Sequence, residues 1–115
     1  MKYPTADLYD KCSIESLKYE RASTENADFL VSLYTELELR NYNIALYHQL
    51  REINGRIWDL ESDIRKGKEG ELGLEEVGRR AIAIRNINAE RIALKNTIAN
   101  LHEEYEEKKY DHASE

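Results

Sequence analysis

Polar side chains recur at helical spacing in two parts of this sequence, and they are the residues best suited to chemistry. Intervals of three and four residues place such side chains on one face of a helix. The first series comprises Arg51, Asn54, Trp58, Glu61 and Arg65, and the second comprises Asn88, Arg91 and Lys95. If the two helices lie together, these side chains form one polar flank.

This polar flank has two interpretations that residue types alone leave open. In the first it is an anion pocket, in which Arg51, Arg91 and Lys95 contact phosphate or carboxylate. Trp58 would then be a flat wall, and Glu61 would orient a guanidinium. In the second, the flank is a network of ion pairs and amides that fixes the register of the helices. No residue is assigned a catalytic role by either interpretation.

Other familiar sites have no matching pattern in the sequence. The histidines (His48, His102 and His112) lack the spacing of metal ligands, and a Glu-x-x-His pair is absent. Cys12 has no histidine near it in sequence, which favours a small buried apolar residue over a nucleophile. We therefore expect no metal and no cofactor.

The apolar pattern that must position the flank predicts long helices. We expect helices over about residues 6–21, 26–66 and 74–108, followed by a disordered tail over about 110–115. An apolar stripe with heptad spacing is formed by Leu46, Leu50, Ile53, Ile57, Leu60 and Ile64. An earlier apolar stripe, formed by Phe29, Leu30, Leu33 and Leu37, is out of phase with it across residues 40–43. One broken helix or two separate helices therefore remain open for 26–66.

Glycines within residues 67–73 predict a tight turn, after which the last helix returns antiparallel to the one before it. A hairpin that closes near residue 70 would place Asn54 near Asn86, and Arg51 near Asn88 and Arg91. Such a hairpin buries one seam, and the first helix covers only part of it. We therefore expect an all-α fold with coiled-coil-like packing, in which a second copy completes a dimeric four-helix bundle.

Length and charge limit the possible partners. A chain of 115 residues forms one domain, and its net charge of −6 argues against binding to nucleic acid. It has a single cysteine, no apolar leader and no run long enough to span a membrane, so we expect a soluble cytoplasmic protein.

Three segments resemble a family of small, all-helical bacterial proteins of unknown function. The segments are residues 10–21, residues 53–65 with Asn54, Trp58, Glu61 and Arg65, and residues 84–98 with Asn88, Arg91 and Lys95. The resemblance implies a gene context of glycosyltransferases and surface polysaccharides, but no activity. It falls on the polar flank and raises the weight of a ligand or partner site there.

Two functions follow as expectations. The first is a helical scaffold or accessory protein that acts through self-association, and through a protein partner if it has one. The alternative is a binding protein or enzyme for a phosphorylated sugar or nucleotide that uses the polar flank.

Overall fold

The structure is a computed structural model that describes residues 2–22, 26–65 and 69–103, apart from the side chains of 63–65 and 69–72. Within these ranges the chain forms four helices, α1 (Thr5–Arg21), α2 (Ala27–Leu39), α3 (Ile44–Arg65) and α4 (Glu69–Leu101). The described ranges contain no strand. The predicted all-α class is therefore confirmed for this part of the chain.

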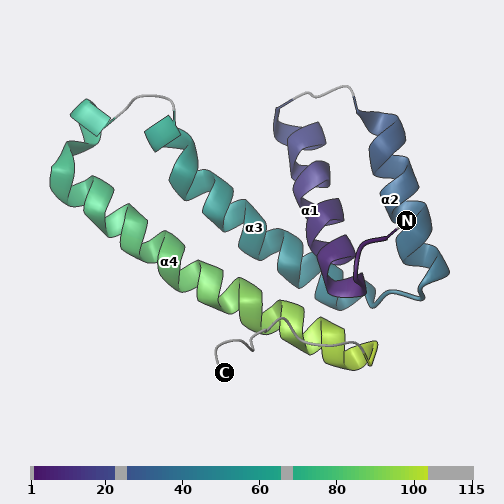
Figure 1. Ribbon diagram of the computed structural model, residues 1–115. Coiled ribbons are helices and arrows are strands. Elements are labelled where there is room, and N and C mark those ends of the chain that lie inside the picture. The colour runs from purple at the N-terminus through teal and green to yellow at the C-terminus, as the bar shows by residue number, and fades with distance from the viewer. Residues whose placement is uncertain (1, 23–25, 66–68, 104–115) are drawn as a thin grey trace.

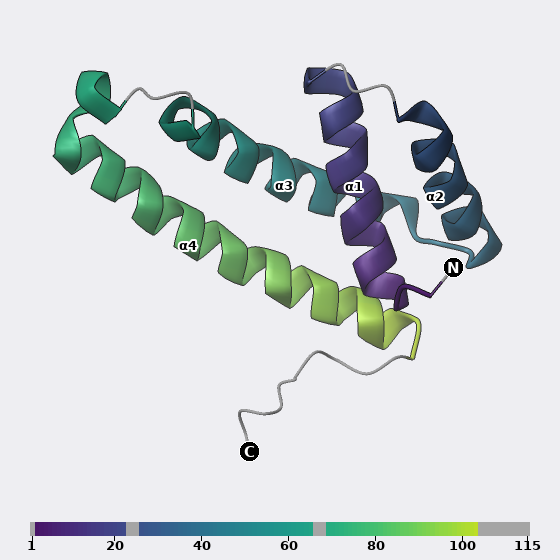
Figure 2. The same ribbon diagram turned by 45° about the horizontal axis from the view of Figure 1, so that its top comes forward.

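Helix α1 is the one described helix that the other three share as a neighbour. Figure 1 shows α1 beside α2 at one side of the molecule and α3 beside α4 along its length. Helix α1 crosses the N-terminal half of α3, and the first turn of α1 lies close to the C-terminal end of α4 (Figure 2). Of the helices described, α1 alone lies against all three others.

The segment predicted over 26–66 is two helices, which resolves the alternative left open at residues 40–43. Helix α2 ends at Leu39, and Asn41 adopts a left-handed conformation with φ of 56°. Asparagine tolerates this conformation better than most residues. The side chain of Asn43 then accepts a hydrogen bond from the backbone N–H of Leu46 at 2.9 Å, which caps the start of α3.

Helix α4 begins and ends earlier than predicted. It starts at Glu69, inside the expected turn, and is interrupted at Gly73, whose φ of 82° and ψ of 155° are not helical. It ends at Leu101, because the chain leaves the helical conformation at Glu103, with φ of 58°. The predicted tail over 110–115 lies outside the described residues, as does Gly67.

The register between α3 and α4 also differs from the predicted one. Arg56 pairs with Glu90 at 3.4 Å, whereas a hairpin closing at residue 70 would have paired it with a residue near 84. The difference arises because the chain turns near Gly73, so α4 passes α3 displaced by more than one helical turn. Arg91 consequently lies level with Asn54, and not with Arg51.

The apolar core lies where α1 meets the other helices. Its fully buried side chains include Leu8, Tyr9, Cys12, Leu33, Leu37, Tyr47, Leu50 and Ile98. The tyrosines satisfy their hydroxyls locally, as Tyr34 and Tyr47 do with each other at 2.7 Å. Away from this core the seam is only half-buried at Ile53, Ile57 and Leu60. The radius of gyration of 15.9 Å exceeds the value of about 13 Å typical of a compact chain of this length.

Replacement of a core leucine should cost far more than replacement of its exposed neighbour. Leu37 is fully buried, whereas Leu39, two positions on, is 73% exposed. We expect Leu37→Ala to lower the free energy of unfolding by about 2–5 kcal/mol. Leu39→Ala should stay within about 0.5 kcal/mol of the parent protein. Urea denaturation measures both, and equal losses would contradict this placement of the core.

Candidate ligand cavity

The polar flank is organised by one carboxylate, that of Asp10 on α1. Arg91 on α4 donates to both of its oxygens, from Nε at 3.1 Å and from Nη2 at 2.5 Å. Asn54 on α3 donates to it from Nδ2 at 2.9 Å. Asp10 is buried, so these three side chains tie α1, α3 and α4 together away from water.

The charge of Asp10 is stabilised by its neighbours. Burial raises the pKa of this carboxyl, but hydrogen bonds from Arg91 and Asn54 lower it by more, helped by the charges of Arg91 and Lys95. The result is a pKa below the ordinary value of 3.8. The hydrogen bonds with Asp10 in turn raise the pKa of Arg91. Lys95 pairs with Asp7 at 2.8 Å, so both cations predicted on α4 are compensated by acids of α1.

A cavity lies beside this network, and most of the residues predicted for the polar flank line it. We call it the central cavity; its volume is about 380 Å³, within the range of small-molecule sites. It is lined by Ile14, Leu17 and Lys18 of α1, by Asn54, Ile57, Trp58 and Glu61 of α3, and by Asn88 and Arg91 of α4. Five of the eight predicted residues therefore share one open wall.

Arg51 does not belong to this group, and the predicted convergence of Arg51 with Arg91 is wrong. Arg51 donates to the hydroxyl of Ser16 at 3.0 Å and to the carboxylate of Glu20. Its position follows from the register of α3 and α4, which places Arg91 level with Asn54. Lys95 does not line the central cavity, and the side chain of Arg65 lies outside the described residues.

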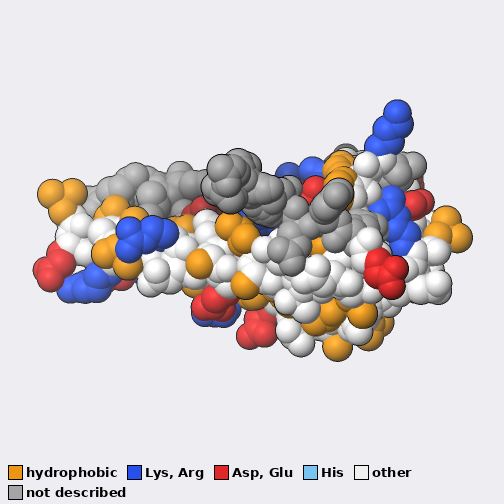
Figure 3. Space-filling view, turned by 60° about the horizontal axis from the view of Figure 1, so that its bottom comes forward, with side chains coloured by type: hydrophobic (Ala, Val, Ile, Leu, Met, Phe, Trp, Pro, Cys, Tyr) orange, Lys and Arg blue, Asp and Glu red, His pale blue; other side chains and the backbone are white. Residues whose placement is uncertain are grey.

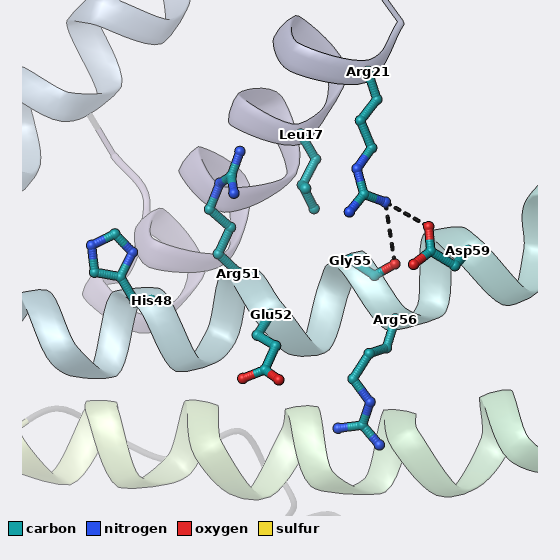
Figure 4. A pocket seen from close by; sticks show the side chains of 8 residues that line it. All are labelled: Leu17, Arg21, His48, Arg51, Glu52, Gly55, Arg56 and Asp59. Carbon is teal, nitrogen blue, oxygen red and sulfur yellow. Dashed lines mark hydrogen bonds and ion pairs between the residues drawn. The ribbon is translucent and has the colours of Figure 1, made fainter.

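Arg51 lines a second space, the side cavity, of about 320 Å³ on the other side of Leu17. Figure 4 shows Arg51 extending toward α1 and Arg56 toward α4, so the arginines of this cavity do not converge. Arg21 lies over α3, where it pairs with Asp59 at 2.8 Å. A Cβ at Gly55 would lie only 3.3 Å from this guanidinium. Because Gly55 has no side chain, Arg21 can approach α3 closely. Because Arg51 and Arg56 extend toward different helices, the side cavity forms no anion pocket.

The acids of α1 that complete the network were not among the residues predicted for the polar flank. Asp10 and Ser13 lie at helical spacing with the buried Ala6 and Leu17, on the face that α1 turns toward the other helices. An ionisable side chain in such a series must have a partner. The sequence therefore shows that Asp10 needs a partner. It does not show that this partner is Arg91, because that pairing depends on the register of α4.

Cys12 and His102 both have structural surroundings that explain them. Burial raises the pKa of the Cys12 thiol to about 11, which leaves it protonated and unreactive. His102 hydrogen-bonds to the hydroxyl of Tyr9 at 2.8 Å. Among the described residues no group of three His, Cys, Asp or Glu side chains is placed to hold a metal ion.

The surface and the comparisons with known proteins give no further assignment. On the face seen in Figure 3, the acidic and basic side chains of the described residues lie in small groups between apolar and uncharged ones. None of the described helices has the length and apolar character needed to cross a membrane.

Searches among protein-family models, curated proteins and solved structures find no match. The family resemblance therefore stays a prediction.

Removal of the charge of Asp10 should destabilise the protein in a pH-dependent way. Asp10→Asn leaves Arg91 partly buried without its anion, and we expect a loss on the order of 3 kcal/mol at pH 7. Because the folded-state pKa of Asp10 lies below 3.8, its contribution is present above that value and is lost as pH falls through the folded-state pKa.

Urea denaturation of both proteins between pH 7 and pH 3 measures this dependence. The stability difference between the parent and Asp10→Asn should shrink below about pH 4. A difference that stayed constant with pH would show that the Asp10 carboxylate has no depressed pKa.

Proposed function

We propose that this protein binds a small organic molecule in the central cavity, between α1, α3 and α4. One observation carries the proposal, namely that a single open cavity is lined by Asn54, Trp58, Glu61, Asn88 and Arg91. The wall combines apolar side chains and a tryptophan face with a few polar groups, as small-molecule sites commonly do. The network around Asp10 holds Asn54 and Arg91 in fixed orientations before a ligand arrives, which lowers the entropic cost of binding.

A second candidate function is that of a self-associating scaffold, in which the hairpin of α3 and α4 pairs with a second copy to form a four-helix bundle. The observation that favours it is the outer face of α4, where Gly78, Ile82, Ala89, Ile92 and Ala93 are all exposed. Small residues of this kind let two helices approach closely, and the isoleucines supply apolar area. The two functions are compatible, because this face does not line the central cavity. A location in the cytoplasm is part of both proposals.

Ligand binding can be read directly from Trp58, the only tryptophan in the chain. A panel of sugars, nucleosides, their phosphates, amino acids and carboxylates should contain a class that changes the emission of Trp58 and raises the melting temperature. The substitution Ile14→Phe adds bulk to the cavity wall and should abolish both effects. Ile44→Phe, at an exposed position at the start of α3 that lines neither cavity, should leave both unchanged. If no class in the panel acts, or if Ile14→Phe binds normally, the cavity is not a ligand site.

Self-association can be tested by light scattering at micromolar concentration. We expect a dimer for the parent protein and a monomer for the double variant Ile82→Glu/Ile92→Glu, because two carboxylates would be desolvated at each α4 face. The matched control is Leu39→Glu, which places a carboxylate on the exposed surface of α2 and should remain dimeric. A monomeric parent protein would exclude the scaffold, and a dimeric double variant would exclude this face.

A further inference from the structure

The orientation of the Asn54 side chain can be deduced from its two partners. Nδ2 lies 2.9 Å from a carboxylate oxygen of Asp10 and 2.8 Å from the hydroxyl oxygen of Ser13. The ionised carboxylate can only accept hydrogen bonds. The hydroxyl of Ser13 donates its own hydrogen to the backbone carbonyl of Asp10 at 2.9 Å, so it must also accept from Asn54. Both hydrogens of the Asn54 amide are therefore committed to α1.

This orientation leaves the carbonyl oxygen of Asn54 as an acceptor. The residue is buried, with 7% of its surface exposed, and it lines the central cavity. Among the described residues, no donor forms a hydrogen bond with this oxygen. Buried carbonyl groups without a partner are uncommon, and each one calls for an explanation. A ligand in the central cavity that donates a hydrogen bond would satisfy it.

Asn88, across the cavity on α4, offers the opposite hydrogen-bonding group. Its carbonyl oxygen accepts from Nη1 of Arg91 at 3.3 Å, which turns its NH₂ group away from Arg91. In the described part of the chain this NH₂ group donates to no protein acceptor. The wall thus presents one acceptor on α3 and two donor hydrogens on α4.

The charges around the cavity do not favour a phosphate. Two cations line it, Lys18 and Arg91, and Glu61 stands in the same wall. Asp10 already binds two nitrogens of Arg91, and Glu15 lies 3.4 Å from Lys18. Both cations of the wall are therefore already paired with a carboxylate, so that a dianion would meet no unpaired positive charge there. A phosphate dianion also has no hydrogen to donate to Asn54.

From these groups we infer that the ligand of the central cavity is an uncharged polar ring with O–H or N–H donors, such as a sugar or a nucleobase, and not its phosphorylated form. The ring would stack on Trp58, donate to the carbonyl of Asn54 and accept from the NH₂ group of Asn88. The inference rests on the proposed function, because it assigns a chemical class to the ligand of the same cavity.

Matched pairs of probes test this assignment by titration of Trp58 fluorescence. The pairs are methyl glucoside with glucose 1-phosphate, uridine with uridine monophosphate, and adenosine with adenosine monophosphate. In at least one pair the uncharged member should bind about tenfold more tightly than its phosphate. The pair that responds distinguishes a hydroxyl-rich ring from a base. For uridine, 3-methyluridine has lost the N–H donor and should bind more weakly.

Two variants connect the effect to the proposed contacts. Asn88→Ala removes the donors facing the cavity and should weaken the uncharged probe about tenfold, consistent with the loss of one net hydrogen bond. Asn86→Ala, at an exposed position of the same helix that does not line the cavity, should bind like the parent protein. Circular dichroism and urea denaturation confirm that both variants remain folded.

The outcomes separate the assignment of the ligand class from the proposed function. The assignment would be overturned if the phosphates bound more tightly than the uncharged probes. If Ile14→Phe still abolished that binding, the central cavity would remain a ligand site, but one for anions. Binding of uncharged probes that Asn88→Ala does not weaken would also overturn it. If no member of any pair binds, the assignment fails, and the wider panel then decides whether the cavity has any ligand.

Discussion

The buried carboxylate of Asp10 is the constraint on which the arrangement of the helices depends. A carboxylate on the inner face of α1 must be compensated, because the free-energy cost of burying an isolated charge is far larger than the stabilisation that the surrounding contacts provide. Its partners come from two other helices, Arg91 from α4 and Asn54 from α3. Apolar side chains would tolerate several angles between α1 and its neighbours α3 and α4, but a bidentate guanidinium and an amide accept few geometries. The same contacts border the central cavity, since Asn54 and Arg91 line its wall.

The sequence was sufficient for those parts of the fold that depend on local spacing. The apolar periodicity predicted α1 within one residue at its start, and the phase change at 40–43 is where Asn41 and Asn43 end one helix and cap the next. The register of α3 against α4 could not be read in this way. It depends on which glycine turns the chain, and several glycines within 67–73 were equally suitable. That choice moved Arg91 from the level of Arg51 to that of Asn54.

The candidate site was predictable to a similar extent, and for related reasons. Spacing along a single helix correctly placed Asn54, Trp58 and Glu61 together, and likewise Asn88 with Arg91. The spacing within one helix could not predict which acids compensate Arg91 and Lys95, because Asp10 and Asp7 lie far from them in sequence. Without those acids the flank resembled an anion pocket. With them, the same arginine is a structural element whose role is to position neighbouring amides.

Cys12 gives the docking of α1 a chemical signature. Its thiol is fully buried in the core formed with α2 and α3, and it lies 3.9 Å from the hydroxyl of Tyr47. With its pKa raised to about 11, the sulfur is both inaccessible and protonated in the folded protein. Alkylation at neutral pH thus requires α1 to separate from α2 or α3, so the rate of thiol modification measures how often the core around α1 opens. Since α1 also supplies one wall of the central cavity, a single cysteine in the natural sequence reports on the integrity of that wall.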